Sequence, residues 1–367
     1  MQDVILKELR LIHFKNHEQA EFQFSPKINA LVGSNGAGKT TILDAVHILC
    51  MTRSYFHSTD SHCIQFDAPF FVAEGCMAVG ESQTPLYCGL KRGEKKVFKA
   101  DDVEYTKLSE HLGRFPVVMV SPYDRDLITE GGETRRKFMD AVIAQSNKTF
   151  LDALVQYNRA LTQRNALLKY FAANRNFASS TLELYDEQLC QWAPIIHEAR
   201  AAFVTDFEPR LQHYYRWMAG ESETVGISYK SHQTECSMRE MLNERLPKDR
   251  VVQYTSAGPH RDDLLFSLHG QPLQRVGSQG QQKSYVVALK LAVFDALKDA
   301  LQIKPILLLD DIFDKLDAKR VEGLIRLVNE HHFGQIFITD THPERTTLMI
   351  TEVNDEAKVL EISSSKS

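Results

Sequence analysis

The stretch GSNGAGKTTILDAV, from Gly33 to Val46, fits the pattern GxxxxGK[ST]. In this pattern the glycines let backbone N–H groups wrap phosphate oxygens, the lysine reaches the β- and γ-phosphates, and the hydroxyl binds Mg²⁺. A strand-like run, KINALVG, precedes the loop and a helical pattern from Lys39 to Cys50 follows it, which disfavours a chance match in a glycine-rich turn. The sequence therefore predicts a nucleotide site formed by Gly33, Ser34, Asn35, Gly36, Ala37, Gly38, Lys39, Thr40 and Thr41.

A second element of such a site is PILLLDDIFDKLD, from Pro305 to Asp317. It predicts a buried parallel strand that ends in two adjacent acids. Asp310 would hold Mg²⁺, and Asp311 would polarise the water that attacks the γ-phosphate. The alternative is a core strand whose acids only cap the next helix. The phosphate-binding loop elsewhere in the chain favours the first interpretation.

Between these two elements lies VGSQGQQKSYVVALKLAVFDAL, in which a serine and a glycine open an amphipathic helix. A helix start presents unpaired N–H groups and the positive end of the helix dipole, so it can receive a phosphate. The phosphate-binding loop already supplies one such helix start to the nucleotide site. A second helix start is explained if Ser278 and Gly280 contact a nucleotide that is bound by a second copy of the chain. The alternative is an N-capped core helix with solvated glutamines.

Composition places the chain among folded proteins that do not cross a membrane. Hydrophobic residues make up 43% and charged residues 25% of the 367 residues, and no apolar run is long enough to span a bilayer. The first residues lack the basic start and continuous apolar stretch of a secretory signal, so we expect a cytoplasmic protein. The six cysteines form no CxxC pair, which favours reduced thiols. The net charge of −5 still allows a local basic patch.

Strand and helix patterns divide the chain into a discontinuous head and an inserted arm. Residues 1–133 and 246–367 show period-two strands, the phosphate-binding loop and a late alternation of strands and helices. Residues 134–245 are mostly helical, with apolar residues at three-four spacing but no sustained heptads. We therefore expect an α/β head with a β-rich amino-terminal lobe, interrupted by an α-helical arm.

The phosphate-binding loop, SQGQ at Ser278 to Gln281, the acidic strand end and LD at Leu316 and Asp317 resemble the ABC-type P-loop ATPase heads of chromosome maintenance and repair. Within that group the chain is closer to the RecF family, and the likeness covers nearly its whole length. The phrases that carry it stand in the family's order: SPYDRDLITEGGETRRKFMD, TQRNALLK, TSAGPHRDDLLFSLHG, SQGQQKS and LLLDDIFDKLD. The lack of an extended coiled coil separates the chain from the larger relatives.

The resemblance implies a role for each residue that matches the motifs. Lys39 would bind phosphate and act in catalysis. Thr40 and Asp310 would bind Mg²⁺, and Asp311 would polarise water. Many relatives have glutamate at the position of Asp311, and the shorter aspartate holds water less favourably, so we expect slow ATP hydrolysis.

The same resemblance implies contacts between two copies of the chain. Ser278, Gly280 and Gln281 would face the γ-phosphate bound by the partner copy. Asp317 would lie in a loop that crosses the same interface. ATP would therefore hold two heads together.

Two further family positions are less well matched. Relatives carry a switch histidine after the last core strand, and His342 is the candidate here. Related heads sense magnesium with a glutamine, and this chain offers only Ser121 or Asp124 near that place.

By resemblance the chain is an ATP-dependent DNA-binding protein of recombinational repair and replication. ATP would drive a homodimer onto dsDNA near ss/dsDNA junctions, and hydrolysis would release it. RecR, with RecO, would be its partners in loading the RecA recombinase. The alternative is another ABC-like ATPase, either the nucleotide-binding subunit of a transporter, which would need a membrane partner, or a nuclease-associated ATPase, which would carry an added acidic metal-binding domain.

Two residue groups have a functional and a structural interpretation. The segment GPHRDD, residues 258–263, could be a metal or nuclease centre, but it supplies too few ligands at fixed spacing, and we favour a turn anchored by salt bridges. Basic residues could contact DNA phosphates or simply form a solvated helical face. These candidates are Arg53, Arg135, Arg136, Lys137, Arg164, Lys169 and Arg175.

Overall fold

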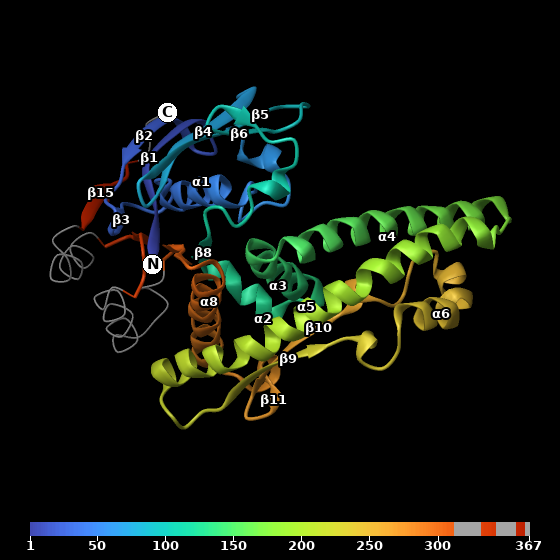
Figure 1. Cartoon of the computed structure of the whole chain (residues 1–367). Coiled ribbons are helices and arrows are strands. Elements are labelled where there is room, and N and C mark those ends of the chain that lie inside the picture. The colour runs from blue at the N-terminus through green and yellow to red at the C-terminus, as the bar shows by residue number, and fades with distance from the viewer. Residues whose placement is uncertain (312–331, 343–356, 364–367) are drawn as a thin grey trace. The chain divides into compact units, whose positions relative to one another are not determined.

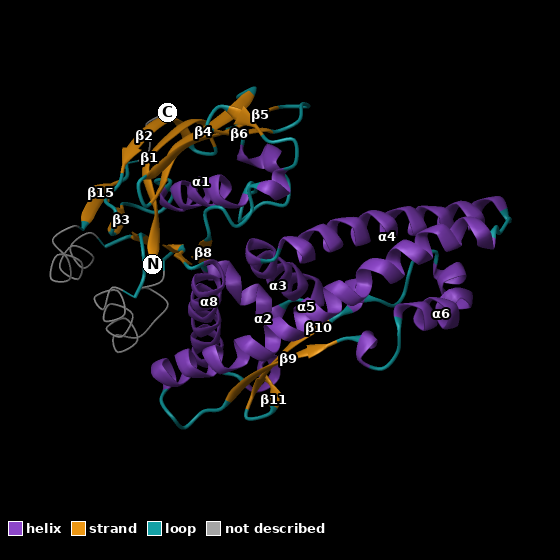
Figure 2. Cartoon of the chain, in the orientation of Figure 1, coloured by secondary structure: helices purple, strands orange, loops and turns teal. Residues whose placement is uncertain are grey.

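The computed structural model describes residues 1–311, 332–342 and 357–363. The chain forms two compact units, which we call the head unit (Met1–Asp124 and Lys283–Ser367) and the arm unit (Arg125–Gln282). These units divide at 124/125 and 282/283, whereas the sequence patterns place the arm at residues 134–245. The extent of the functional arm stays a prediction. The expected α/β class is confirmed, since both sheets and helices build the head unit (Figures 1 and 2).

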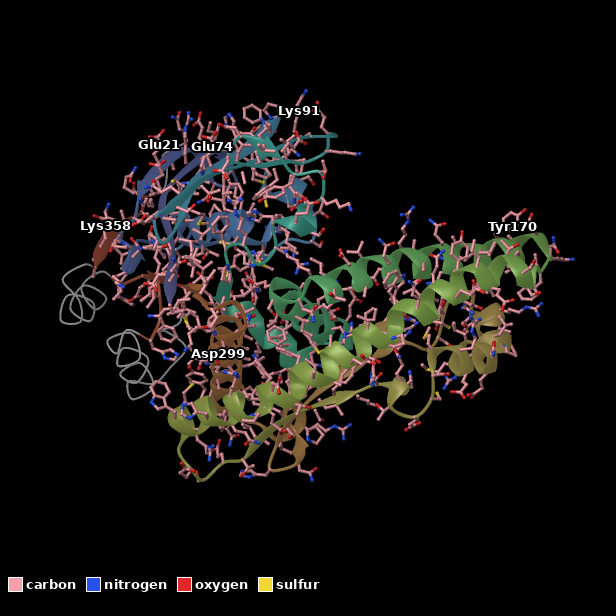
Figure 3. The ribbon with its side chains drawn as sticks, in the orientation of Figure 1. Glu21, Glu74, Lys91, Tyr170, Asp299 and Lys358 are labelled. Atoms are coloured by element: carbon pink, nitrogen blue, oxygen red, sulfur yellow. The ribbon has the colours of Figure 1, made fainter. Side chains whose placement is uncertain are left out.

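The first sheet of the head unit is largely antiparallel, with the order β12-β1-β4-β5-β6-β7 and β2 paired to β1. A β-bulge between Leu6 and Glu8 shifts the alternation of β1 by one residue, so that both halves of the strand send leucines into the core. Glu21 and Glu74 lie on the other face (Figure 3) and both pair with Arg10. The strands are β1 (Gln2–Phe14), β2 (His17–Gln23), β4 (Phe70–Val79), β5 (Ser82–Lys91), β6 (Val97–Ala100), β7 (Val103–Glu104) and β12 (Ile303–Lys304).

The second sheet of the head unit is parallel and carries the nucleotide motifs. Its order is β15-β3-β14-β13-β8, and every neighbouring pair is parallel. Four of its strands are buried at every position, which explains their continuous apolar runs. Helix α1 (Lys39–Met51) follows β3 and packs against strands of both sheets, so nearly all of it is buried. The strands are β3 (Ile28–Val32), β8 (Val117–Val120), β13 (Ile306–Leu309), β14 (Ile336–Asp340) and β15 (Lys358–Glu361).

The arm unit is built on a long antiparallel pair of helices, α4 (Lys148–Asn174) and α5 (Ser179–Ala219). Tyr170 lies near the tip of this hairpin (Figure 3). A small antiparallel sheet in the order β11-β10-β9 packs against α5, and this sheet was not predicted from the sequence. The helices found within residues 1–311, α5 included, lack any stretch apolar and long enough for a bilayer.

The remaining elements of the arm unit pack along the helical hairpin and the small sheet. They are α2 (Asp126–Thr129), α3 (Gly132–Ser146), α6 (Met238–Val252), α7 (Leu273–Val276), β9 (Val225–Lys230), β10 (Asp263–Leu268) and β11 (Gln271–Pro272). Helix α8 (Gln279–Leu301) begins in the arm unit and ends in the head unit. The short 3-10 helices of the chain are Asp60–Cys63, Leu108–Glu110, Pro122–Arg125, His232–Thr234 and Pro259–Arg261.

Two fully buried arginines hold the arm unit together. Arg164 on α4 is inaccessible to solvent and donates to Asp186 at 2.5 Å and to Asp249 at 2.8 Å. Arg200 on α5 pairs with Asp140 at 2.9 Å and with Asp262 at 3.0 Å. A buried guanidinium needs carboxylate partners because its charge has left water. These pairs therefore fix α4 against α5 and α6, and fix α5 against α3 and the turn that contains Asp262.

The prediction that Arg164 contacts DNA is wrong, because its side chain is buried inside the arm unit and bonded to Asp186 and Asp249. Arg135 is likewise engaged, in a two-point ion pair with Asp263 at 2.8 and 2.9 Å. Arg136 donates to the carbonyl of Asp262 at 2.6 Å. The helical spacing of these residues gave no sign of the partners that tertiary packing supplies.

The cost of breaking the Arg164 pairs is measurable. Arg164→Met leaves Asp249 buried without its cation, so we expect the free energy of unfolding to fall by about 3–5 kcal/mol. Arg159→Met, an exposed arginine on the same helix, is the matched control and should change it by less than about 0.5 kcal/mol. Urea unfolding followed by circular dichroism compares them. Equal midpoints would contradict the structural role of Arg164.

Candidate nucleotide site

The phosphate-binding loop connects β3 to α1 through glycines in the left-handed region. Gly36 has φ 81° and Gly38 has φ 105°, which other residues rarely adopt. A Cβ on Gly38 would also lie 2.4 Å from Nε2 of His17. Lys39 is 5% exposed, and its ammonium donates to the carbonyls of Gly33 at 2.8 Å and Ser34 at 2.9 Å. The ammonium of Lys39 thus lies against the loop, where it would also contact a bound phosphate.

This loop is held by Asn16, in the turn between β1 and β2, and by His17, the first residue of β2. Neither role was predicted from the sequence. Asn16 donates to the carbonyl of Gly36 at 3.2 Å and accepts from the hydroxyl of Thr41 at 2.7 Å. His17 Nε2 lies 3.3 Å from the carbonyl of Gly38. Burial lowers the pKa of His17, so the neutral ring donates this bond. Neither residue belongs to the loop motif, and no pattern in the chain links them to it.

The acidic strand end meets the phosphate-binding loop as the sequence predicts. Thr40 Oγ1 donates to Asp310 Oδ1 at 2.8 Å across 270 residues of sequence. Thr339, on β14 between the two strands, also donates to Asp310 Oδ1, at 2.9 Å, and accepts from the backbone N–H of Asp311 at 2.8 Å. Burial raises the pKa of Asp310, while the bonds from the two threonines oppose that change. Thr339 is therefore a further member of the site.

The oxygens gathered here fit a magnesium ion. Mg²⁺ prefers hard oxygen ligands and is usually held by one or two carboxylates, a hydroxyl and phosphate oxygens. Thr40 and Asp310 supply a hydroxyl and a carboxylate in contact. Asp311 Oδ1 is buried and has no hydrogen-bond partner among the described residues, and the backbone of Asp311 is left-handed at φ 47°. A buried, unpaired carboxylate oxygen beside the loop is suited to holding a water or an ion ligand.

The SQGQ segment forms a capped helix start in the arm unit. The hydroxyl of Ser278 accepts from the N–H of Gln281 at 3.3 Å, and the side-chain oxygen of Gln281 accepts from the N–H of Ser278 at 2.8 Å. The amide of Gln281 also donates to Glu223 at 2.8 Å. Ser278 is exposed and Gly280 half-buried. The helix start is thus capped within the chain, Gln281 is bonded to Glu223 rather than solvated, and Ser278 is exposed.

The other expected site residues are placed as follows. His342 is exposed, and its backbone N–H donates to Asp340 at 3.2 Å. The backbone carbonyl of Asp340 accepts from the N–H of Gly33 at 3.3 Å. His342 therefore follows a strand end that contacts the phosphate-binding loop. Asp317 lies outside the described residues. Of the two sensor candidates, Asp124 is buried and accepts from the N–H of Ser121 at 2.7 Å.

The GPHRDD segment is a turn packed inside the arm unit. His260 Nδ1 accepts from the hydroxyl of Tyr157 at 2.7 Å, and Nε2 donates to the carbonyl of Thr255 at 2.9 Å. Asp262 pairs with Arg200. Within residues 1–311, 332–342 and 357–363, no cluster of acids, histidines and cysteines is suited to a metal. The segment therefore anchors the arm.

Comparison with known protein families agrees with this geometry. Residues 8–215 match the family described as AAA domain. The chain is 45% identical to the DNA replication and repair protein RecF of Flavobacterium johnsoniae, over 97% of this chain and 99% of that protein. It is 43% identical to RecF of Phocaeicola vulgatus, over 98% of this chain and 96% of that protein.

Comparison with solved structures agrees as well. The structure titled recombination mediator protein RecF-ATP in the RecFOR pathway matches with a TM-score of 0.89 at 27% identity, covering 99% of this chain and 97% of that one. The Smc head domain of Pyrococcus furiosus matches with a TM-score of 0.56 at 15% identity, covering 98% of this chain and 94% of that one, and shows a shared fold. The ABC-type head expected from the sequence is confirmed.

The role of Thr339 can be tested with a pair of substitutions. Thr339→Val removes one donor to Asp310 and the acceptor for the Asp311 N–H, so we expect the rate of ATP hydrolysis to fall about 10- to 100-fold. Thr339→Ser keeps the hydroxyl and should stay within about threefold of the parent chain. Phosphate release at saturating ATP measures both. Equal rates for the two variants would remove Thr339 from the site.

The neutral state of His260 predicts a loss of stability in acid. Burial lowers its pKa from 6.5 to about 4. The unfolded chain therefore binds more protons than the folded chain below about pH 6.5, and stability falls as the pH falls. Glutamine can imitate both hydrogen bonds without titrating. From about pH 7 to about pH 5 the parent chain should lose about 2 kcal/mol more than His260→Gln in urea unfolding. Parallel losses would contradict the assignment.

Proposed function

The chain belongs to the RecF family of DNA replication and repair proteins, and from this premise we propose that it is a switch on duplex DNA, closed when ATP joins two copies. The chain has the fold of an ABC-type head and is an ATP-hydrolysing enzyme. The observation that supports the switch best is the contact of Thr40, Asp310 and Thr339, because it brings both nucleotide motifs to one sheet edge.

Each residue of this sheet edge has a part in ATP hydrolysis. Lys39 exchanges its loop carbonyls for the β- and γ-phosphates. Thr40 and Asp310 hold Mg²⁺, which neutralises charge that develops on the phosphates. Asp311 orients the attacking water with its unpaired, buried oxygen. Its side chain is one carbon shorter than glutamate, so turnover is slow, and the ATP-bound state lasts long enough to act on DNA.

The second half of the pocket comes from a partner copy. Ser278 is exposed at a helix start, which offers backbone N–H groups and a positive dipole end to the γ-phosphate of the other head. Gly280 lets the phosphate approach closely, and Gln281 holds the turn through its capping bond. By resemblance to the family, Asp317 belongs to a loop that crosses the interface, and His342 is the switch histidine. Binding of one ATP thus creates contacts in two chains, and hydrolysis removes them.

Duplex DNA binds to the ATP-joined pair through phosphate contacts that do not read sequence. Lys169 and Arg175, near the tip of the arm hairpin, are exposed, unlike the buried Arg164. Binding of this kind weakens steeply with salt. The functional setting is the cytoplasm, at ss/dsDNA junctions beside gaps, with RecR and RecO as the partners that help load recombinase.

The dimer can be tested by sedimentation in ATP, ADP and no nucleotide. The parent chain should dimerise with ATP alone, and Lys39→Met should remain monomeric because it lacks the phosphate ligand. Ser278→Arg should also remain monomeric, since a large cation occupies the contact.

A matched control separates this effect from loss of a helix cap. Ser237 caps α6 with the same reciprocal bonds, to Glu240, so Ser237→Arg removes a cap of equal type at about 1 kcal/mol without touching the contact. It should dimerise like the parent chain. Normal dimerisation of Ser278→Arg would refute the contact between copies.

A further inference from the structure

The arm unit presents an exposed surface at the end of α6 that the proposed function does not use. This surface continues into the loop that leads from α6 to the GPHRDD turn (Figure 1). Its apolar side chains are Val251, which is 80% exposed, and Tyr254, which is 41% exposed. Lys248, Arg250 and Arg261 are exposed in the same segment. We call these residues the α6 patch.

The two arginines of the α6 patch are held by aromatic rings rather than by acids. The guanidinium of Arg261 lies over the ring of Tyr254, 5.0 Å from its centroid, and that of Arg250 lies over Phe177 at 4.2 Å. A ring attracts the cation through its face but leaves the N–H donors of the guanidinium unused. Neither arginine, nor Lys248, has a side-chain hydrogen bond or ion pair with another described residue. Three cations are therefore available to acids from another molecule.

Buried polar contacts fix the backbone that carries the α6 patch. Asp249, between the exposed Lys248 and Arg250, accepts from Arg164 at 2.8 Å and from the N–H of Ser256 at 3.0 Å. The N–H of Thr255, which follows Tyr254, donates to Asn165 on α4 at 2.7 Å. The end of α6 and the loop after it are therefore tied to α4.

The GPHRDD turn fixes the other end of the patch. His260 accepts from the hydroxyl of Tyr157 at 2.7 Å, and Asp262 pairs with Arg200 at 3.0 Å. Arg261 stands between these two residues in sequence and is exposed, while both of them bond inside the arm unit. A surface that is already ordered loses little conformational entropy on binding, so it is suited to recognition.

Charge and apolar exposure together define the partner. Within residues 245–261 the one acid is Asp249, and it is buried against Arg164. The exposed cations therefore favour an acidic partner. A nucleic-acid backbone would pair with them but would leave Val251 without an apolar contact. A protein segment can supply both, and arginine and tyrosine are the side chains that most often anchor protein interfaces.

We propose that the α6 patch is a docking surface for an acidic segment of a partner protein that also carries an aliphatic side chain. The acidic groups pair with the cations of the patch, and the aliphatic side chain packs against Val251 and Tyr254. Docking of this kind does not require ATP to join two copies of the chain, so the inference goes beyond the proposed function and does not rest on it.

Fluorescence anisotropy of the full-length chain without nucleotide tests the docking surface. One probe is a fluorescein-labelled peptide of the repeat Glu-Glu-Leu, and the other has the repeat Glu-Glu-Ser, which lacks the aliphatic side chain. The parent chain should bind the first peptide about fivefold more tightly than the second. Because the net charge of the chain is −5, binding of either acidic peptide reports a local surface rather than the overall charge.

Substitutions within the patch identify its members. Arg261→Gln and Arg250→Gln should each weaken binding of the Glu-Glu-Leu peptide about 5- to 10-fold, because each removes a charged donor. Val251→Ser should weaken it about threefold and leave the Glu-Glu-Ser peptide unchanged. The matched control is Arg216→Gln, an exposed arginine about 50 Å further along α5 than Glu183, which pairs with α6. It should bind both peptides like the parent chain.

Three results would overturn the inference. The first is that the parent chain does not bind the Glu-Glu-Leu peptide, or binds both peptides equally. The second is unchanged peptide binding in both arginine variants, with their fold checked by circular dichroism. The third is weaker binding of duplex DNA in these variants in place of weaker peptide binding, which would make the patch a nucleic-acid contact. Sedimentation with ATP tests the proposed function separately, so a chain that binds the peptide but forms no dimer would refute the switch and keep the docking surface.

Discussion

The order of strands in the parallel sheet is the constraint on which the nucleotide site depends. Strand β14 lies between β3 and β13, and all three run the same way. Their carboxyl ends therefore meet at one edge, where the loop after β3, the acids after β13 and Thr339 on β14 come into contact. A different order would separate Thr40, which follows β3, from Asp310, which follows β13, and their hydrogen bond could not form.

The arm unit holds a long helical hairpin together without the heptad repeats of a coiled coil. Buried ion pairs join Arg164 on α4 to Asp186 on α5, and Arg200 on α5 to Asp140 on α3. Such pairs demand defined geometry, because a buried charge that loses its partner is costly. Exposed cations occur along the whole arm unit, from Lys137 and Lys148 to Lys169 and Arg175 near the tip of the hairpin.

Helix α8 belongs to both units, because the division between them falls inside it. The capped Ser278 turn precedes its first residue in the arm unit, and its later turns are buried in the head unit.

The sequence by itself determined the loop motif, the acidic strand, the helix caps and the apolar periods, because all of these are set by residues close together in the chain. It thereby predicted the head fold and the assignment of Thr40 and Asp310 to one magnesium site. Only the tertiary structure decided that Asn16 and His17 hold the loop, that Thr339 completes the acidic cluster, and that Arg164 is buried. The physical reason is that the spacing of apolar residues shows which face of a helix or strand is buried. The partner of a polar side chain, in contrast, is fixed by packing between segments that lie far apart in the sequence.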